Sequence, residues 1–246
     1  MNQAAVVAPN GALFAARSVR ATYGPVQVVF DVDVDVRAGE LVCLLGANGA
    51  GKSSLLGALA GAVRGSGELL LKDKQLKTLS MHQRAANGLA FVPERRRNVF
   101  SSMTVAENLA LGLRLLPLHR REQGRDRILQ LFPILNERMD AVAGMLSGGE
   151  QQMLAIGMAL GKEPTVLILD EPSQGLAPVV LDTLQRTLET LKKEGLALLV
   201  AEQNLAFASK IADRYLVLSH GVIVASGGKE ELQQRDALLA AYMDVN

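Results

Sequence analysis

Residues 41–53 read L-V-C-L-L-G-A-N-G-A-G-K-S, five apolar residues that lead into a glycine-rich turn and a lysine–serine pair. The apolar run predicts a buried parallel strand over Glu40 to Leu45, and a helix of small residues is expected from Lys52 to about Ala60. Between them, Gly46 to Ser53 matches G-x-x-x-x-G-K-[ST] in the strand–loop–helix context of a phosphate-binding loop. This stretch therefore predicts an α/β fold with an anion site.

The chemistry of this loop gives each residue type an expected role. Glycines let the backbone wrap a phosphate chain, and successive N–H groups together with the helix N-terminus supply positive potential. We expect Lys52 to reach the β- and γ-phosphates of a nucleotide and the Ser53 hydroxyl to bind Mg²⁺. The alternative is a tight glycine turn with a solvated lysine, which the flanking strand and helix disfavour. The other residues expected at the phosphates are Gly46, Asn48, Gly49, Ala50, Gly51 and Ser54.

A second apolar run, Val166 to Leu169, is followed directly by Asp170 and Glu171. A parallel strand delivers its C-terminal residues to the ligand crevice of an open α/β sheet. We expect Asp170 to hold Mg²⁺, directly or through water, and Glu171 to polarise the attacking water. The alternative is a strand followed by a capping Asp–Glu pair ahead of Pro172, and the phosphate-binding loop favours the catalytic interpretation.

The segment L-S-G-G-E at residues 146–150 predicts the start of a helix, with a serine N-cap, two glycines and an acid in the first turn. Such a start is a second candidate anion site, formed by Ser147, Gly148 and Gly149, about a hundred residues from the first. Ordinary helix capping is the alternative. One nucleotide does not need two phosphate cradles.

Composition limits the classes of protein that this chain can be. It has 246 residues, 49% hydrophobic and 21% charged, with a formal net charge of +1, which excludes disorder for most of its length. Its apolar runs fall far short of the ~18 residues that a membrane span needs. No basic excess favours wholesale nucleic-acid binding. A single cysteine, Cys43, excludes a disulfide framework, and the N-terminus lacks a signal-peptide pattern, so we expect a cytosolic chain.

Strands and helices alternate along the rest of the chain. F-D-V-D-V-D-V at residues 30–36 has period two and predicts a strand with one solvent-exposed face. A second strand, expected over Glu68 to Lys72, belongs with it. Residues 80–160 are expected to be mostly helical, and a hairpin is expected around His220-Gly221. The alternation predicts an α/β core with a parallel sheet. We expect residues 1–11 to be a flexible lead and residues 12–246 to form a single domain.

The phosphate-binding loop, L-S-G-G-E and L-D-E-P at residues 169–172 occur in an order that resembles ATP-binding-cassette (ABC) ATPases. The resemblance covers roughly Leu13 to Tyr242. It implies a P-loop NTPase fold with a mostly parallel sheet, an N-terminal antiparallel β-subdomain and an inserted α-helical subdomain roughly over residues 80–160. It also implies that ATP and Mg²⁺ bind between two ATPase subunits arranged head to tail. Hydrolysis then drives a membrane-spanning permease, with the ATPase at the cytoplasmic face of the membrane.

The resemblance implies roles for three further residues. Tyr23 lies where the family stacks an aromatic ring on adenine, with a half-buried strand-end tyrosine as the alternative. Glu94 occupies the loop that usually carries a glutamine reaching for Mg²⁺ and the attacking water, and a carboxylate can still accept from metal-bound water. Gln203 stands where most members have a histidine that contacts the γ-phosphate. Its amide can donate a hydrogen bond but cannot be protonated.

These departures from the common pattern indicate a subfamily. V-P-E-x-R at residues 92–96, L-S-G-G-E-Q-Q-M-L-A-I-G at 146–157 and E-Q-N at 202–204 resemble branched-chain amino-acid importers, in particular the smaller of their two paired ATPase subunits. Arg95, Met158 and Ala177-Pro178 depart from that subfamily. The resemblance implies a paralogous ATPase, or a second copy of this chain, as dimer partner. It also implies permease subunits and, indirectly, a solute-binding protein.

Other functions stay open at this stage. Urea, amides and other small solutes are alternative cargoes, and S-M-H-Q-R-A-A at residues 80–86 resembles lipopolysaccharide export ATPases. That class expects a histidine at position 203 and a glutamine at position 94. A soluble cassette ATPase acting on nucleic acid or ribosomes normally has tandem cassettes or long inserts. Arg95 to Arg97, with Arg84 near by, are expected beside the permease-docking segment, or form a solvated basic run.

Overall fold

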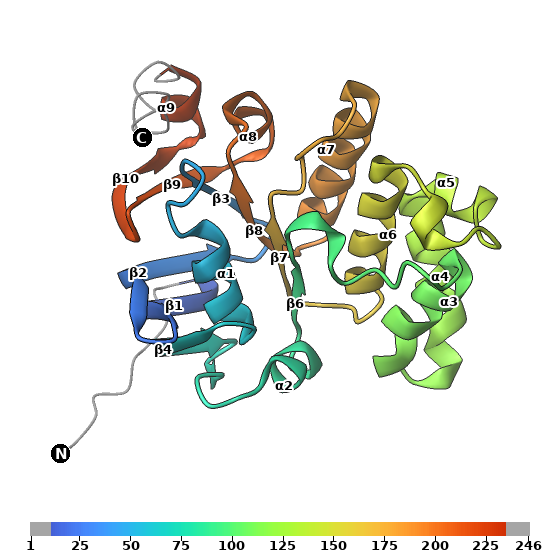
Figure 1. Cartoon of the computed structure of the whole chain (residues 1–246), viewed down its shortest axis with the longest axis horizontal. Coiled ribbons are helices and arrows are strands. Elements are labelled where there is room, and N and C mark those ends of the chain that lie inside the picture. Colours follow the sequence, from blue (N-terminus) through green and yellow to red (C-terminus); the bar gives the residue numbers. More distant parts are fainter. Residues whose placement is uncertain (1–10, 235–246) are drawn as a thin grey trace.

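Two β-sheets and a group of helices lie side by side in residues 11–234, the part of the chain that this computed structural model describes (Figure 1). The smaller sheet and α1 lie at one end of the molecule, helices α3 to α6 lie at the other, and the larger sheet runs between them. The expected flexible lead lies outside the described residues except for Gly11. The fold therefore has three parts that meet along the larger sheet.

The smaller sheet is antiparallel, with the strand order β2-β1-β4-β5. In β2 the expected alternation places Val32, Val34 and Val36 in the core, whereas Asp31 and Asp33 face solvent. Phe30 is in phase with Val32 in the sequence but is exposed, because an extra residue at Asp31, with φ of 50°, shifts the register between β1 and β2. The strands are β1 Ala12–Tyr23, β2 Val26–Arg37, β4 Arg64–Leu71 and β5 Lys74–Gln75.

The larger sheet has the strand order β10-β9-β3-β8-β7-β6, and every neighbouring pair except β10–β9 is parallel. Every residue of β3, β7 and β8 is buried, as parallel strands covered on both faces require. The predicted α/β fold, with its antiparallel N-terminal part, is confirmed. The strands are β3 Leu41–Leu45, β6 Leu89–Val92, β7 Val166–Asp170, β8 Ala197–Glu202, β9 Arg214–Ser219 and β10 Val222–Gly228.

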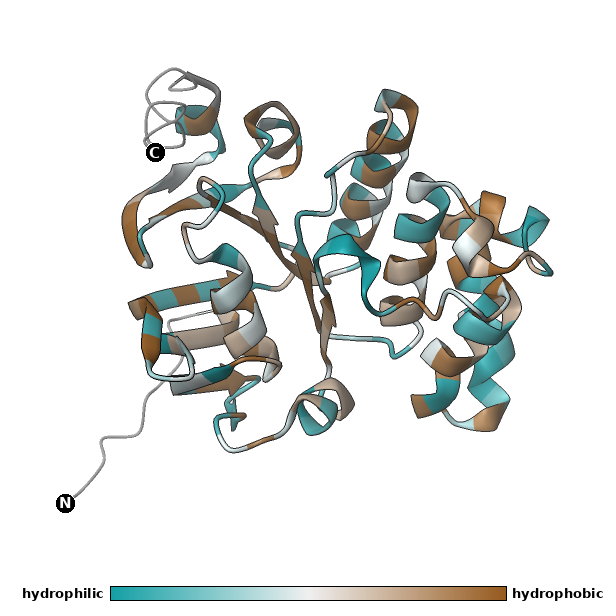
Figure 2. Cartoon of the chain, viewed as in Figure 1, coloured by the Kyte–Doolittle hydropathy of each residue, from teal (hydrophilic) through white to brown (hydrophobic). Residues whose placement is uncertain are grey.

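Helices cover both faces of the larger sheet. On one face, Leu55 and Leu59 of α1 pack between the two sheets, and on the other Leu154 of α6 and Leu188 of α7 pack against the central strands. The central strands are uniformly apolar in Figure 2, whereas the outer helices are mixed. Within residues 11–234, no helix is long and apolar enough to cross a bilayer. The helices are α1 Lys52–Ala60, α2 Met81–Ala86, α3 Val105–Gly112, α4 Leu118–Leu131, α5 Pro133–Glu137, α6 Gly148–Leu160, α7 Pro178–Lys193, α8 Leu205–Ile211 and α9 Lys229–Gln234.

The expectation of a mostly helical stretch over residues 80–160 is confirmed by helices α2 to α6, but the sequence did not indicate the strand β6 within it. Leu89–Val92 pairs in parallel with β7 and forms the edge of the larger sheet. A run of four residues between Gly88 and Pro93 is too short to show a strand period in the sequence. Helices α3 to α6 begin only at Val105, where Thr104 forms the capping box typical of a helix start. The division of residues 12–246 into domains stays a prediction.

Arg84 does not join the surface basic run that the sequence suggested. Its side chain is buried, and its guanidinium lies against the C-terminal end of α1, where helix carbonyls lack intrahelical partners. Burial lowers the pKa of Arg84, which stays a cation. The residue therefore fastens α2 to the end of α1. Its acceptors, at 2.7–3.2 Å, are the carbonyl oxygens of Ala58, Leu59, Lys77 and Leu79.

We expect Arg84→Met to lower the free energy of unfolding by about 2–4 kcal/mol, because four carbonyl oxygens lose their donor. Urea denaturation measures this value, and the exposed Arg97→Met is the matched control, with an expected change within about 0.5 kcal/mol. Equal effects of the two substitutions would contradict a structural role for Arg84.

Candidate active site

The glycine-rich loop joins β3 to α1 and lies against the turn between β9 and β10. A Cβ on Gly46 would lie 2.4 Å from the carbonyl oxygen of Leu218, and one on Gly221 would lie 2.3 Å from that of Val28. The backbone N–H of Gly221 donates to the carbonyl oxygen of Ala50 at 2.9 Å. Glycine is therefore required at both positions, and the hairpin supports the loop from outside.

Lys52 opens α1 and points back into the loop. Its N-cap, Gly51, has φ of 105° and offers no side-chain acceptor, so the first N–H groups of α1 lack a side-chain cap. The Lys52 Nζ donates to the carbonyl oxygens of Gly46 at 2.7 Å and Ala47 at 3.0 Å, and lies 3.0 Å from Oε1 of Glu171. The lysine side chain is 4% exposed and that of Glu171 is 9% exposed. This is a buried ion pair.

Asp170 ends β7 beside the loop. Its Oδ1 is buried and has no hydrogen-bond partner. Burial, together with the negative charges of Glu171 and Glu94, raises the pKa of Asp170 to about 6, whereas a hydrogen bond with Ser53 and the positive charge of Lys52 oppose the shift. The structure thus brings Ser53, Asp170, Glu171 and Glu94 together at the carboxyl end of the sheet. An unpartnered buried carboxylate oxygen costs free energy unless a ligand uses it.

Glu171 follows Asp170 in a conformation that is rare for a residue with a side chain. Its φ is 47°, and its N–H donates to the carbonyl oxygen of Ala201 in β8 at 3.0 Å. Strained backbone of this kind persists where the surrounding structure holds it and is common at functional sites. The bond to β8 aims the Glu171 carboxylate at Lys52.

Glu94, Gln203 and Tyr23 lie at the ends of other elements. Glu94 lies at the start of a short 3-10 helix, Glu94–Arg96, and its carboxylate pairs with Arg95 at 3.1 Å. Gln203 follows β8 and is exposed. Tyr23 ends β1 with 54% of its surface exposed, so the ring is about half-buried at the strand end and its stacking on adenine stays a prediction. An exposed ring at a strand end is available for stacking.

The segment with Ser147, Gly148 and Gly149 lies apart from this group. Ser147 is the N-cap of α6 and forms a capping box with Glu150, which also pairs with Arg138 at 3.1 Å. The predicted serine N-cap is thus confirmed. In Figure 1, α6 and α1 lie on opposite sides of β6 and β7. The two candidate anion sites of the chain are therefore separate surfaces.

Sequence reasoning missed Glu202, at the end of β8. This side chain is 1% exposed and accepts hydrogen bonds from Ser173 and Asn204. Burial raises the pKa of Glu202 to about 7, against the opposing effect of these bonds. The motif E-Q-N contains this glutamate, but the resemblance to the family gives a role only to its glutamine. A strand-end acid after five apolar residues is a candidate buried carboxylate.

The model of the ABC transporter family matches residues 29–174. This chain belongs to that family. A nucleotide-free ATP-binding cassette from an ABC transporter has the same fold, with a TM-score of 0.82, 24% identity, and coverage of 92% of this chain and 95% of that one. The ATP-binding subunit of another ABC transporter is 27% identical, with a TM-score of 0.79 and coverage of 94% and 95%. The predicted family and fold are confirmed.

Curated relatives extend the similarity over nearly the whole chain. It is 46% identical to the high-affinity branched-chain amino acid transport ATP-binding protein BraG of Pseudomonas aeruginosa, over 90% of this chain and 95% of that protein. Identity is 35% to a probable branched-chain amino acid transport ATP-binding protein, LivF of Archaeoglobus fulgidus (92% and 97%). It is 30% to the lipopolysaccharide export system ATP-binding protein LptB of Escherichia coli strain K12 (94% and 97%). As an ABC ATPase, the chain binds and hydrolyses ATP.

We expect Lys52→Ala to abolish ATP hydrolysis and to lower the free energy of unfolding without nucleotide by about 3 kcal/mol, because Glu171 is left buried without its cation. Phosphate release and urea denaturation measure the two effects. The control is the double variant Lys52→Ala/Glu171→Gln, in which the stability recovers and the activity does not. Wild-type turnover in Lys52→Ala would contradict the assignment of the loop.

Proposed function

We propose that this chain is the ATP-hydrolysing subunit of an importer of branched-chain amino acids or related small solutes. The observation that carries the proposal is the 46% identity, over 90% of the chain, to a branched-chain amino acid transport ATP-binding protein. The archaeal relative at 35% identity has a name of the same class. Glu94 and Gln203 support the assignment, since lipopolysaccharide export ATPases are expected to have a glutamine and a histidine at these two positions.

We propose that the loop holds the phosphates of ATP. Gly46, Asn48 to Gly51 and Ser54 would surround them with backbone N–H groups, and the uncapped start of α1 adds positive potential. The flexible ammonium group of Lys52 would leave Glu171 and pair with the phosphates when they occupy the loop. The exposed ring of Tyr23 would stack on adenine.

The same group of side chains fits Mg²⁺. The orphaned Oδ1 of Asp170, the Ser53 hydroxyl and the carboxylate of Glu94 are oxygen donors at one edge of the sheet. Within residues 11–234 no cluster of three or more metal-ligating acids, histidines or cysteines exists, and Mg²⁺ sites commonly use one or two carboxylates with substrate phosphates. The ion would neutralise charge on the phosphate oxygens.

Glu171 is the group that would take the proton of the attacking water. Once Lys52 turns to the phosphates, the Oε1 of Glu171 loses its partner and can accept a proton. The bond from its N–H to Ala201 keeps the carboxylate aimed at the loop. Gln203, next to β8, would donate its amide to the γ-phosphate without changing charge.

We propose that the chain works as a head-to-tail dimer with a paralogous ATPase or with a second copy. Ser147, Gly148 and Gly149 would then bind the nucleotide held by the partner's loop. The support is their separation from the loop of their own chain by β6 and β7 (Figure 1). The start of α6 is a candidate anion site, and a nucleotide on the loop of the same chain would leave it unoccupied.

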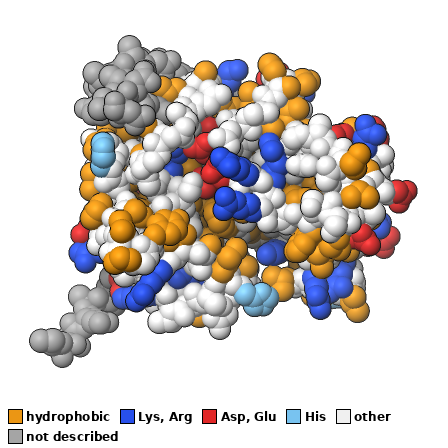
Figure 3. Space-filling view, in the orientation of Figure 1, with side chains coloured by type: hydrophobic (Ala, Val, Ile, Leu, Met, Phe, Trp, Pro, Cys, Tyr) orange, Lys and Arg blue, Asp and Glu red, His pale blue; other side chains and the backbone are white. Residues whose placement is uncertain are grey.

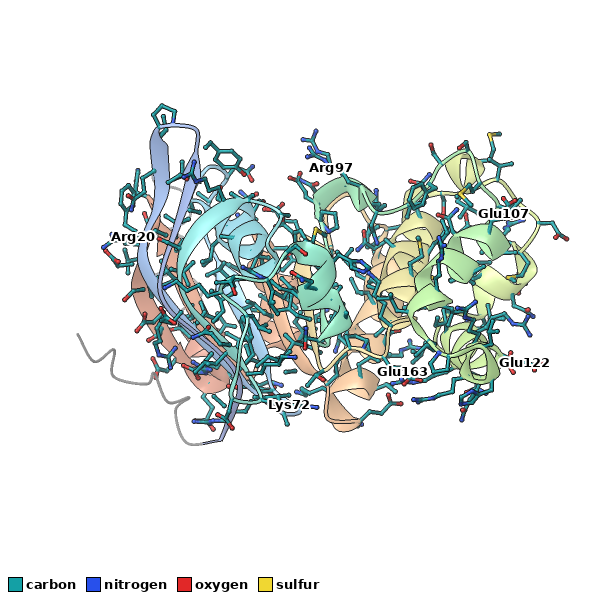
Figure 4. The ribbon with its side chains drawn as sticks, turned by 90° about the horizontal axis from the view of Figure 1, so that it is seen from below. Arg20, Lys72, Arg97, Glu107, Glu122 and Glu163 are labelled. Carbon is teal, nitrogen blue, oxygen red and sulfur yellow. The ribbon has the colours of Figure 1, made fainter. Side chains whose placement is uncertain are left out.

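The permease would bind near the 3-10 helix Glu94–Arg96. Basic side chains gather near the middle of the face in Figure 3, beside acidic ones, and Arg97 projects from the end of this helix in Figure 4. Through this contact the subunit would sit at the cytoplasmic face of the membrane, in a complex that also works with a solute-binding protein.

Lipopolysaccharide export is the second candidate function. The 30% identity to LptB covers 94% of this chain, and S-M-H-Q-R-A-A at residues 80–86 resembles that class. That segment is α2 with its N-cap, and its arginine, Arg84, is used to fasten α2 to α1. Because Arg84 has a structural role, the motif is weaker evidence for a lipopolysaccharide export function.

We expect Glu171→Gln to keep ATP bound and to slow hydrolysis by about a hundredfold or more, as removal of a general base does. Size-exclusion chromatography with Mg-ATP would show an accumulated dimer, and phosphate release would give the rate. The control is Glu163→Gln, a surface acid paired with Arg120. A rate near that of the wild type would exclude Glu171 as the base and would make Glu94 the candidate.

For the transport function, we expect the chain to co-purify with importer permease subunits, and the complex in vesicles to take up radiolabelled leucine when ATP and a solute-binding protein are present. The physical reason is that closure of the ATPase pair moves the permease. A complex with Lys52→Ala is the control without uptake. Association with export subunits, or uptake of urea in place of leucine, would contradict the proposed cargo.

A further inference from the structure

Glu202 is a buried carboxylate that bridges two loops at the carboxyl end of the larger sheet. Its Oε1 accepts from the backbone N–H of Ser173 at 3.0 Å, and its Oε2 accepts from the Ser173 hydroxyl at 2.7 Å. The Oε2 also accepts from the backbone N–H of Asn204 at 3.4 Å. Asn204 is the N-cap of α8. One side chain thus fixes the turn after β7 and the start of α8.

Both loops carry residues with proposed roles in hydrolysis. Ser173 follows Glu171 by two residues, and Gln203 lies between Glu202 and Asn204. The N–H of Glu171 also donates to Ala201, the residue before Glu202. Any shift of the Glu202 carboxylate therefore changes the position of the loop with the base relative to the loop with Gln203.

We propose that Glu202 is a positioning residue for ATP hydrolysis, whose carboxylate holds the Glu171 and Gln203 loops at a fixed separation. The inference rests on the roles proposed above for those two residues. Both carboxylate oxygens of this buried side chain accept hydrogen bonds within the protein, from Ser173 and Asn204, so Glu202 would not contact the nucleotide itself. It acts through Ser173 and through the start of α8.

The fold retains this carboxylate at a cost in stability. Burial disfavours the charged form, which raises the pKa of Glu202 to about 7. Because the pKa of Glu202 is higher in the folded state than in the unfolded state, the stability of the fold decreases as the pH rises from the unfolded-state pKa through the folded-state pKa. Its titratable neighbours include Glu171, which is paired with Lys52, and the Cys43 thiol of β3.

Glu202→Gln separates a positioning role from a structural one. The amide has the same shape, can accept from the Ser173 N–H and can donate to its hydroxyl, but it leaves the Asn204 N–H without an acceptor. We expect kcat for ATP to fall about tenfold or more while KM stays within about twofold, since the phosphate contacts are unchanged. We also expect an equal or higher Tm, with the larger gain at about pH 8 than at about pH 5.5.

Two variants of Ser173 and one distant control complete the experiment. Ser173→Ala removes only the 2.7 Å bond to Oε2 and is expected to lower kcat less than Glu202→Gln does, whereas Ser173→Thr keeps a hydroxyl and restores turnover. Thr187→Val removes another buried hydroxyl, on α7 and away from the site, and is expected to leave kcat unchanged.

The outcomes distinguish this inference from the proposed function. A wild-type kcat in Glu202→Gln, or a fall in kcat that Thr187→Val reproduces together with a lower Tm, overturns the positioning role. If Glu171→Gln keeps its turnover, the base assignment fails instead. A fall in kcat with unchanged KM and undiminished Tm, rescued in Ser173→Thr relative to Ser173→Ala, supports the role of Glu202.

Discussion

The ion pair between Lys52 and Glu171 is the interaction on which the site depends. Parallel strands bring their carboxyl ends to one edge of the sheet, and there β7 delivers Asp170 and Glu171 into a buried space. Without the lysine, two buried acids would lie side by side uncompensated, and burial together with neighbouring charges already raises the pKa of Asp170 to about 6. In the proposed function, the phosphates would take the lysine when they bind, and this exchange would release the proposed base. Nucleotide binding and activation of Glu171 are then one event.

Much of this arrangement could be predicted from the sequence, because the strands involved are uniformly apolar and end in characteristic residues. LVCLL before the glycine-rich turn and VLIL before Asp170 predict buried parallel strands, and both are confirmed as β3 and β7. β6 was missed, since four residues cannot show a period. The outward turn of Phe30 was missed because a bulge depends on the pairing with β1, which the sequence of β2 alone does not contain.

Buried polar residues were harder to predict than the motifs around them. Arg84 lies in a polar segment that reads as surface, and only the tertiary fold brings the carbonyl oxygens at the end of α1 to its guanidinium. Glu202 reads as one letter of E-Q-N, and its burial depends on Ser173, which is 29 residues away. The pairing of Lys52 with Glu171 is likewise a long-range contact between two motifs that the sequence analysis treated separately. Local patterns predict elements and loop chemistry, whereas the partners of buried charges come from the topology.

The start of α6 poses the opposite problem, since its local structure is complete, whereas the nucleotide proposed to bind it would be held by another chain. Ser147 already accepts from the N–H of Glu150, and Glu150 is held by Arg138, so capping alone stabilises the helix. A cap needs no second glycine, yet a Cβ on Gly149 would lie 2.8 Å from the side chain of Val180 at the start of α7. Gly149 is therefore needed for close packing of α6 on α7, and this packing fixes the direction in which the helix start points. Core packing thus sets the direction of the helix start, and the head-to-tail dimer proposed above would use that direction without any change in the fold of this chain.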